Sequence, residues 1–374
     1  MSSNPKKTEN RYVNDLRRFS YFQSQFFDLK GVTVPLGLSV IFLTLVGLYV
    51  ASTQHGISED WLIVVVAAIV GGYMALNIGA NDVANNMGPA VGGKVLTVVS
   101  AILIAAVCET AGALLAGGDV VKTVSKGIIS PGDSVSVDEF RDLMLSALFA
   151  AALWINFATI LNAPVSTTHS IVGGVLGAGI AAAGFGLVNW STMAAIAASW
   201  VISPVFGAMF AAAILFVIKK KILNVDDRLT AAKTWVPIMI GLMAAAFAAY
   251  MAMKGLKKIW HPSVIEVLVY SVFAFFAAYF LSRPYIARRV VSLEGSRKDV
   301  NSLFDLPLIA GAALLSFAHG ANDVANAVGP LAAIVSTVGE GAGIGSKVTI
   351  PLWVMAIGAF GIALGLGLFG PKLI

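Results

Sequence analysis

The heptapeptide Gly79-Ala-Asn-Asp-Val-Ala-Asn85 occurs again at residues 320–326, and both copies lie inside long apolar runs. Each copy is followed by Gly-Pro, at 88–89 and at 329–330. Burying a carboxylate in apolar surroundings is costly, so the duplicated frame predicts that Asp82 and Asp323 act together. Polar interruptions in two halves of an apolar chain indicate a transport site between repeats.

The composition is that of a membrane protein. Of 374 residues, 58% are hydrophobic and 12% charged, and the mean hydropathy is +0.85. We therefore predict an all-α, polytopic membrane protein in a lipid bilayer. The expected crossings or half-crossings are 32–53, 61–79, 95–117, 140–161, 165–186, 190–218, 234–253, 262–281, 305–319 and 348–369. The single cysteine, Cys108, excludes an internal disulfide.

The basic residues predict the topology. They cluster in the first 30 residues, at 219–233 and at 283–298, which places these segments in the cytoplasm, whereas loop 51–60 is acidic and is expected outside. Lysines at 254–258 disagree with this pattern. The basic residues that give the net charge of +5 lie beside the predicted spans. Because the membrane topology explains them, they do not indicate a nucleic-acid partner.

The same topology defines the repeats. The two heptapeptides enter the membrane from opposite faces, which predicts inverted-topology repeats. The expected parts are a cytoplasmic segment 1–30, a first half 31–218 with its repeat core at about 61–186, a central part 219–304 with two spans and a cytoplasmic linker, and a second repeat 305–374. An insertion of about nine residues near 336–347 shifts the frame, so that 102–117 resembles 352–367.

The heptapeptides predict a cation site. Gly79 and Gly320 are expected to break their helices, giving discontinuous half-helices whose new starts Asn81 and Asn322 cap. Freed carbonyls, carboxylates and amide oxygens suit a small cation. Glu109 is a third polar interruption, with helix packing or a protonated carboxyl as the alternatives.

The segment Asn162-Ala-Pro-Val-Ser-Thr-Thr-His169 predicts a helix start. Its hydroxyls at Ser166, Thr167 and Thr168 and the free N–H groups can bind an anion, although simple capping explains them as well. A Ser166–His169 pair is also compatible with an intramembrane enzyme as an alternative function. No oxyanion scaffold supports catalysis, so we predict that the protein is not an enzyme. Neither heptapeptide nor 162–174 contains Lys or Arg, so an anion beside two Asp requires a mobile cation.

Taken together, these motifs resemble the inorganic phosphate transporter family of sodium– or proton–phosphate symporters. The matching motifs are the two heptapeptides, Glu-Thr-Ala-Gly at 109–112, Pro-Val-Ser-Thr-Thr-His at 164–169 and Ser-Trp-Val-Ile-Ser-Pro at 199–204. The resemblance implies phosphate as substrate, a coupling cation, an inverted repeat and a homodimer. We also predict a multi-pass protein of the plasma membrane with its N-terminus in the cytoplasm. Carried over by motif, the phosphate site is expected at Asp82, Asn85, Thr110, Ser166, Thr167, Thr168, Asp323 and Asn326. Sodium is expected at Asn81, Asp82, Glu109, Asn322 and Asp323.

One part of the family pattern falls outside this sequence. Ser166 follows Asp82 by 84 residues, so a second Ser-Thr-Thr-His would fall near 407, beyond Ile374, and we expect the second repeat to be incomplete. The predicted function is uptake of phosphate by symport with sodium, with no other cofactor. The alternatives are proton coupling, sulfate or another oxyanion as substrate, and a passive anion channel.

Overall fold

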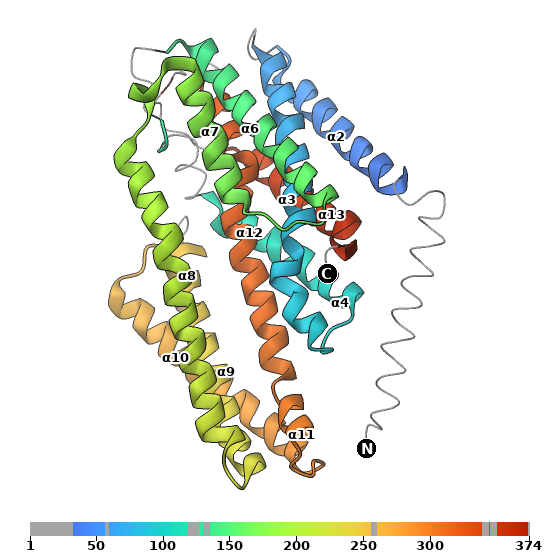
Figure 1. Cartoon of the computed structure of the whole chain (residues 1–374), viewed down its shortest axis with the longest axis vertical. Coiled ribbons are helices and arrows are strands. Elements are labelled where there is room, and N and C mark those ends of the chain that lie inside the picture. The colour runs from blue at the N-terminus through green and yellow to red at the C-terminus, as the bar shows by residue number, and fades with distance from the viewer. Residues whose placement is uncertain are drawn as a thin grey trace. The chain divides into compact units, whose positions relative to one another are not determined.

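The computed structural model describes residues 33–56, 60–118, 127–129, 135–255, 260–338, 344 and 350–372. Within these ranges the chain is built of helices, and the one β-bridge is an isolated pair between Ile129 and Val188 (Figure 1). Nine of the described helices are long and apolar enough to cross a membrane. The expected all-α, polytopic architecture is confirmed, and the predicted N-terminal segment 1–30 lies outside the described residues.

The chain divides into two compact units, and the heptapeptides belong to the larger one. In this unit α3 packs against α2, α6 and α13, while α6 also packs against α7 and α13 against α4. Its helices are α2 (Thr33–Gln54), α3 (Trp61–Gly92), α4 (Val98–Ala116), α6 (Val137–Ile160), α7 (Thr167–Ala183), the part of α12 (Asp305–Val335) from Leu315 onward, and α13 (Leu352–Phe369). Short 3-10 turns lie at Phe185–Leu187 and Gly370–Lys372.

The smaller unit comprises residues 194–314 of the described chain. Its helices are the part of α8 (Trp190–Ile218) from Ala194 onward, α9 (Arg228–Tyr250), α10 (Val264–Val290), α11 (Arg297–Ser302) and the start of α12, with π-helical turns at Lys219–Leu223 and Met251–Gly255. Helices α9 and α10 pack along each other. A cluster of fully buried side chains, including Ile222, Val236, Ile286 and Leu303, forms the core of this unit.

The heptapeptides do not break their helices. Helix α3 runs without interruption through its copy and past Pro89, and α12 does the same past Pro330. The expected break at Gly79 and Gly320 is therefore wrong, as is the expectation that Asn81 and Asn322 cap new helix starts. The predicted crossings 61–79 and 305–319 also end too early, because the polar residues continue the helix instead of ending it.

Close helix packing explains why glycine stands at both positions. A Cβ on Gly79 would lie 1.9 Å from the carbonyl oxygen of Ile362 in α13, and one on Gly320 would lie 2.1 Å from that of Glu109 in α4. Both distances are far below van der Waals contact, so only glycine lets the backbones approach this closely.

The partner helices present glycines of their own. A Cβ on Gly365 would lie 2.0 Å from the carbonyl oxygen of Leu76, and one on Gly112 would lie 1.9 Å from that of Phe317. Leu76 and Phe317 are in the same register as the two heptapeptides, so α3 meets α13 as α12 meets α4. This equivalence pairs Gly112 with Gly365, so the insertion is about three residues longer than the nine that the sequence predicted. Two apolar sequences can be matched in several registers, so only the packing of the helices fixes this length.

The helix start predicted near Pro164 is confirmed. Helix α7 begins at Thr167, and Ser166 is its N-cap, with Oγ accepting a hydrogen bond from the backbone N–H of His169 at 3.2 Å. Helix α7 has 17 residues, which is shorter than the crossing 165–186 that the sequence predicted.

Candidate functional site

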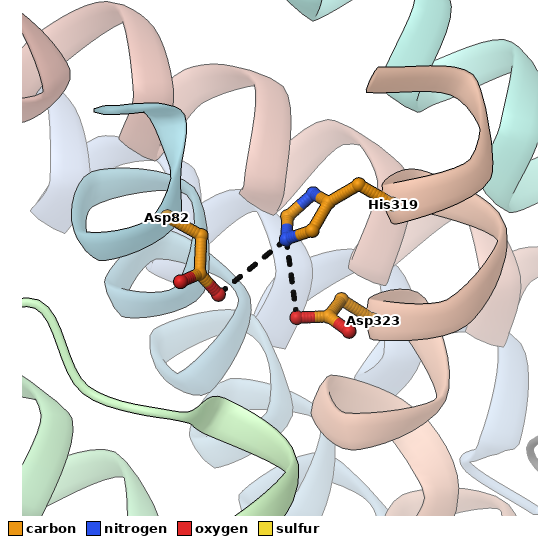
Figure 2. A group of neighbouring side chains, drawn as sticks. All are labelled: Asp82, His319 and Asp323. Carbon is orange, nitrogen blue, oxygen red and sulfur yellow. Dashed lines mark ion pairs between the residues drawn. The ribbon is translucent and has the colours of Figure 1, made fainter. Parts of the chain in front are cut away.

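The two heptapeptides bring their carboxylates to one place, with a histidine between them (Figure 2). The Nε2 atom of His319 lies 3.4 Å from Oδ2 of Asp82 and 3.2 Å from Oδ2 of Asp323. Both Asp residues are buried, with 6% and 5% of their surface exposed. Asp82 comes from α3, and His319 and Asp323 stand one turn apart on α12, so uninterrupted helices fix all three positions.

A third carboxylate lies on the other side of the imidazole. Oε1 of Glu109, from α4, lies 3.2 Å from Nδ1 of His319 and accepts a hydrogen bond of 2.8 Å from Nδ2 of Asn86. Glu109 is 1% exposed, and its Oε2 has no hydrogen-bond partner among the described residues. The ring nitrogens of His319 lie at ion-pair distance from the carboxylates without hydrogen-bond alignment. An imidazole whose two ring nitrogens are buried is therefore surrounded by three acidic groups.

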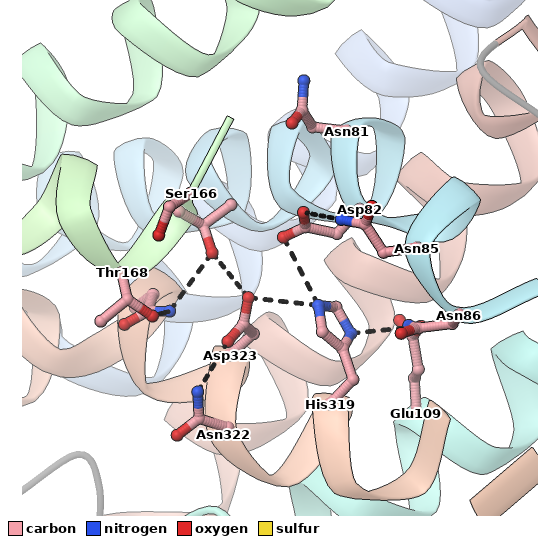
Figure 3. A network of polar contacts seen from close by, with 12 residues as sticks. Asn81, Asp82, Asn85, Asn86, Glu109, Ser166, Thr168, His319, Asn322 and Asp323 are labelled. Atoms are coloured by element: carbon pink, nitrogen blue, oxygen red, sulfur yellow. Dashed lines mark hydrogen bonds and ion pairs between the residues drawn. The ribbon is translucent and has the colours of Figure 1, made fainter. Parts of the chain in front are cut away.

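The start of α7 completes the network with hydroxyl groups (Figure 3). Thr167 donates a 2.6 Å hydrogen bond from Oγ1 to Oδ2 of Asp323. Nδ2 of Asn326 donates to Oγ1 of Thr168 at 3.0 Å and, more weakly, to Oγ1 of Thr167 at 3.4 Å. The second heptapeptide thus meets the helix start through side chains more than 150 residues apart in sequence.

The first heptapeptide holds the segment that leads into α7. Asn81 donates from Nδ2 to Oγ1 of Thr159 at 2.9 Å and to the carbonyl of Ala163 at 3.1 Å, and its Oδ1 accepts from the backbone N–H of Val165 at 2.8 Å. These bonds engage both ends of the amide, and Figure 3 shows the side chain pointing away from the carboxylates. The structure therefore places Asn81 as a support for the α6–α7 connection.

The remaining predicted residues lie around this centre. Asn85 donates from Nδ2 to Oδ1 of Asp82 at 3.1 Å, and Asn322 donates to Oδ1 of Asp323 at 3.0 Å. Ser166 is exposed and its Oγ is engaged with the backbone and ring of His169, so it acts as a cap in this structure. Thr110 is half-buried and follows Glu109 on α4.

The polar surroundings of Glu109 occur in only one of the two equivalent helix contacts. In the register set by the paired glycines, Glu109 corresponds to Ile362, and the heptapeptide frame pairs Asn86 with Ala327 and His319 with Ile78. All three polar residues are therefore replaced by apolar ones in the other contact. The structure combines a symmetric pair of aspartates with a one-sided group of Asn86, Glu109 and His319.

This arrangement can hold a cation and an oxyanion side by side. One ligand atom from each of Asp82, His319 and Asp323 lies within 4.8 Å of the other two. Carboxylate and amide oxygens suit hard cations, and imidazole nitrogen can carry a proton or bind a softer metal. Hydroxyl groups at the start of α7 suit an oxyanion. Ionisable groups buried among membrane-spanning helices mark substrate or ion pathways, so the arrangement favours the class of membrane transporters.

The comparisons with known proteins identify the family within that class. The model of the phosphate transporter family matches residues 78–374. A Helicobacter pylori (strain J99) protein named "Putative phosphate permease" is 45% identical over 96% of this chain and 68% of its own length. "Inorganic phosphate transporter 2-1, chloroplastic" of Arabidopsis thaliana is 33% identical over 92% of this chain and 62% of its own length. The chain belongs to the phosphate transporter family, as its motifs indicated, and it is a multi-pass membrane protein.

A solved structure supports the same assignment. "The sodium-dependent phosphate transporter" superimposes with a TM-score of 0.78 at 35% identity, covering 83% of this chain and 76% of the other. Together with the family match, this supports phosphate transport as the function of the chain.

Sequence reasoning missed one central residue. His319 precedes the second heptapeptide, where the first copy has Ile78, and it is not among the site residues that the sequence predicted. The contrast with Ile78 was the available signal, because a repeat that replaces an apolar residue by a titratable one beside a paired Asp indicates a special environment. The approach of Glu109 to His319 was not visible, because α4 and α12 are distant in sequence.

Proposed function

We propose that this phosphate transporter is a secondary active symporter that takes up inorganic phosphate together with sodium ions. The observation that carries the proposal is the close approach of Asp82 and Asp323 in a region whose heptapeptides contain no Lys or Arg. The sodium-dependent transporter that shares the fold supports the choice of cation.

The electrostatics require a positive partner. Two carboxylate oxygens within 4.8 Å of each other repel by at least about 3.5 kcal/mol at an effective dielectric constant near 20. A phosphate at the start of α7 would add to this repulsion, whereas sodium ions between the acids would cancel it. Binding of the anion and the cation is then interdependent. A membrane potential that is negative inside favours inward movement of the loaded site's net positive charge by about 2.3 kcal/mol per charge per 100 mV.

We propose that one group of residues binds the oxyanion and another binds sodium. Thr167, Thr168 and Asn326 present hydroxyl and amide groups to an oxyanion. Asp82 and Asp323 present oxygens to sodium, with Glu109 nearby. We include Asn85, Thr110, Ser166 and Asn322 as proposed contacts of the loaded site, because they lie on the same helix segments.

The charge pattern supports a cytoplasmic N-terminus, and membership of the phosphate transporter family supports a homodimer. We propose a plasma-membrane protein with its N-terminus in the cytoplasm, inverted repeats and a homodimeric state. The equivalent glycine contacts of α3 with α13 and of α12 with α4 support a repeated unit. Cysteine accessibility in the loops would test the orientation, and light scattering of the purified protein would test the dimer.

The decisive measurement is phosphate uptake into proteoliposomes under three conditions: an inward sodium gradient, an inward proton gradient and neither. We expect uptake above the equilibrium level with the sodium gradient. Uptake that ignores both gradients would refute symport. Unlabelled sulfate and arsenate as competitors would identify the anion, and currents that reverse at the anion's Nernst potential without cation dependence would indicate a channel.

Proton coupling is the second candidate, and His319 is the observation that favours it. Its imidazole lies between three carboxylates, and imidazole is a side chain that can carry a proton. In the variant His319→Gln, a proton-coupled transporter would lose the dependence of uptake on the pH gradient. A sodium-coupled transporter would keep its sodium dependence, although with altered affinity. The two outcomes separate the candidates.

A further inference from the structure

A second buried charge lies in the same unit, far along the helices from the aspartates. Arg141, in the second turn of α6, is 5% exposed. A buried guanidinium is costly unless its donors are satisfied, so its partners show what it is for. The site described above makes no use of it.

The partners of Arg141 come from three different segments. Nε donates to Oγ1 of Thr337 at 2.9 Å, and Nη2 donates to the carbonyl of the same residue at 2.8 Å. Nη1 pairs with Oδ2 of Asp60 at 2.8 Å and with Oδ1 of Asp138 at 3.0 Å. Asp60 is the N-cap of α3, and Thr337 follows the end of α12. One side chain therefore ties the end of α12 to the starts of α3 and α6.

The tied end of α12 leads directly to the site. Thr337 lies 14 residues beyond Asp323, a distance of about 21 Å along a helix. Every residue of α12 from 323 to 334 is buried. We call the group of Arg141, Thr337, Asp60 and Asp138 the clasp. The helix that carries His319 and Asp323 is thus packed from the site to the clasp.

We propose that the clasp is a gate: its contacts close one end of the transport path and must open for the site to reach that face of the membrane. The proposal rests on the proposed symport, because a symporter exposes its site to each side in turn. The chemistry suits a contact that opens repeatedly. Asp60 and Asp138 are 51% and 86% exposed in their side chains, so water can replace them at little cost. The acidic loop 51–60 is expected outside, which makes this the outer gate.

The gate is tested by the reactivity of a cysteine placed behind the clasp. Cys108→Ser removes the chain's single cysteine, and Ala333→Cys places a thiol at a fully buried position of α12. In vesicles without substrate, a membrane-impermeant maleimide should label this thiol at least about tenfold faster when Arg141→Gln is added, because loss of even one of the charge-assisted contacts of Arg141 is expected to have that effect. Thr337→Val removes only one acceptor and should give a smaller increase.

A matched reporter separates a gate from a general loss of packing. Ala152→Cys is equally buried on α6, and its labelling should not change with Arg141→Gln. An equal rise at both reporters, or no rise at residue 333, would overturn the gate.

The reporter protein that carries Cys108→Ser and Ala333→Cys gives a further test, because a merely structural contact would not respond to the transported ions. With Arg141 intact, sodium and phosphate together should change the labelling rate at residue 333, and an unchanged rate would also overturn the gate. Labelling of the variant without substrate does not depend on which cation drives uptake. The gate can therefore fail while sodium coupling stands, and sodium coupling can fail while the gate stands.

Discussion

Replacing Thr167 by valine tests the contact that joins the start of α7 to the second heptapeptide. Valine keeps the branched shape and removes the hydroxyl that donates 2.6 Å to Oδ2 of Asp323. Hydrogen bonds to charged groups contribute about 1.5–3 kcal/mol. At 1.4 kcal/mol per factor of ten, we expect uptake efficiency to fall roughly 10- to 100-fold. Asn326 keeps its 3.0 Å bond to Thr168, so the loss stays local.

The assay is the initial rate of phosphate uptake into proteoliposomes, measured against phosphate and against sodium. We expect the main effect on KM, because the hydroxyl orients a ligand group in the loaded site. Thr167→Ser, which keeps the hydroxyl, should retain most of the activity. Ser170→Ala removes a hydroxyl one turn further along α7, where it bonds the carbonyl of Ser166, and should be close to the parent. Equal losses in Thr167→Ser and Thr167→Val would refute the reasoning, since shape rather than hydrogen bonding would then matter.

Other substitutions test the remaining parts of the site. Asp82→Asn and Asp323→Asn should each abolish cation-coupled uptake while the protein still inserts and purifies as a folded species; normal transport by both would contradict the proposed site. Gly320→Ala forces a methyl group to within 2.1 Å of the carbonyl oxygen of Glu109, so thermal unfolding in detergent should reveal a loss of about 1–3 kcal/mol, and an unchanged midpoint would contradict the packing argument. Asn81→Leu leaves the groups of the α6–α7 connection unsatisfied and should cost about 1–3 kcal/mol per orphaned group. Protease resistance that matches the parent would show that this connection does not depend on the amide.

The sequence alone determined the class of the fold and the key acids. High hydropathy leaves helices as the structure that satisfies every backbone group in lipid, and the duplicated heptapeptide singled out Asp82 and Asp323. The capping role of Ser166 and the start of α7 also followed from local rules, because Pro, Ser and Thr act on the backbone next to them.

Only the tertiary structure decided what the glycines and the titratable residues do. Gly79 and Gly320 looked like helix breakers, but they are contact points for α13 and α4, since a missing Cβ permits either outcome and only the neighbouring helix selects one. The approach of Glu109 to His319 likewise depends on the register between two helices more than 200 residues apart in sequence. Apolar helices carry little sequence signal for that register, because many of their faces are equally hydrophobic.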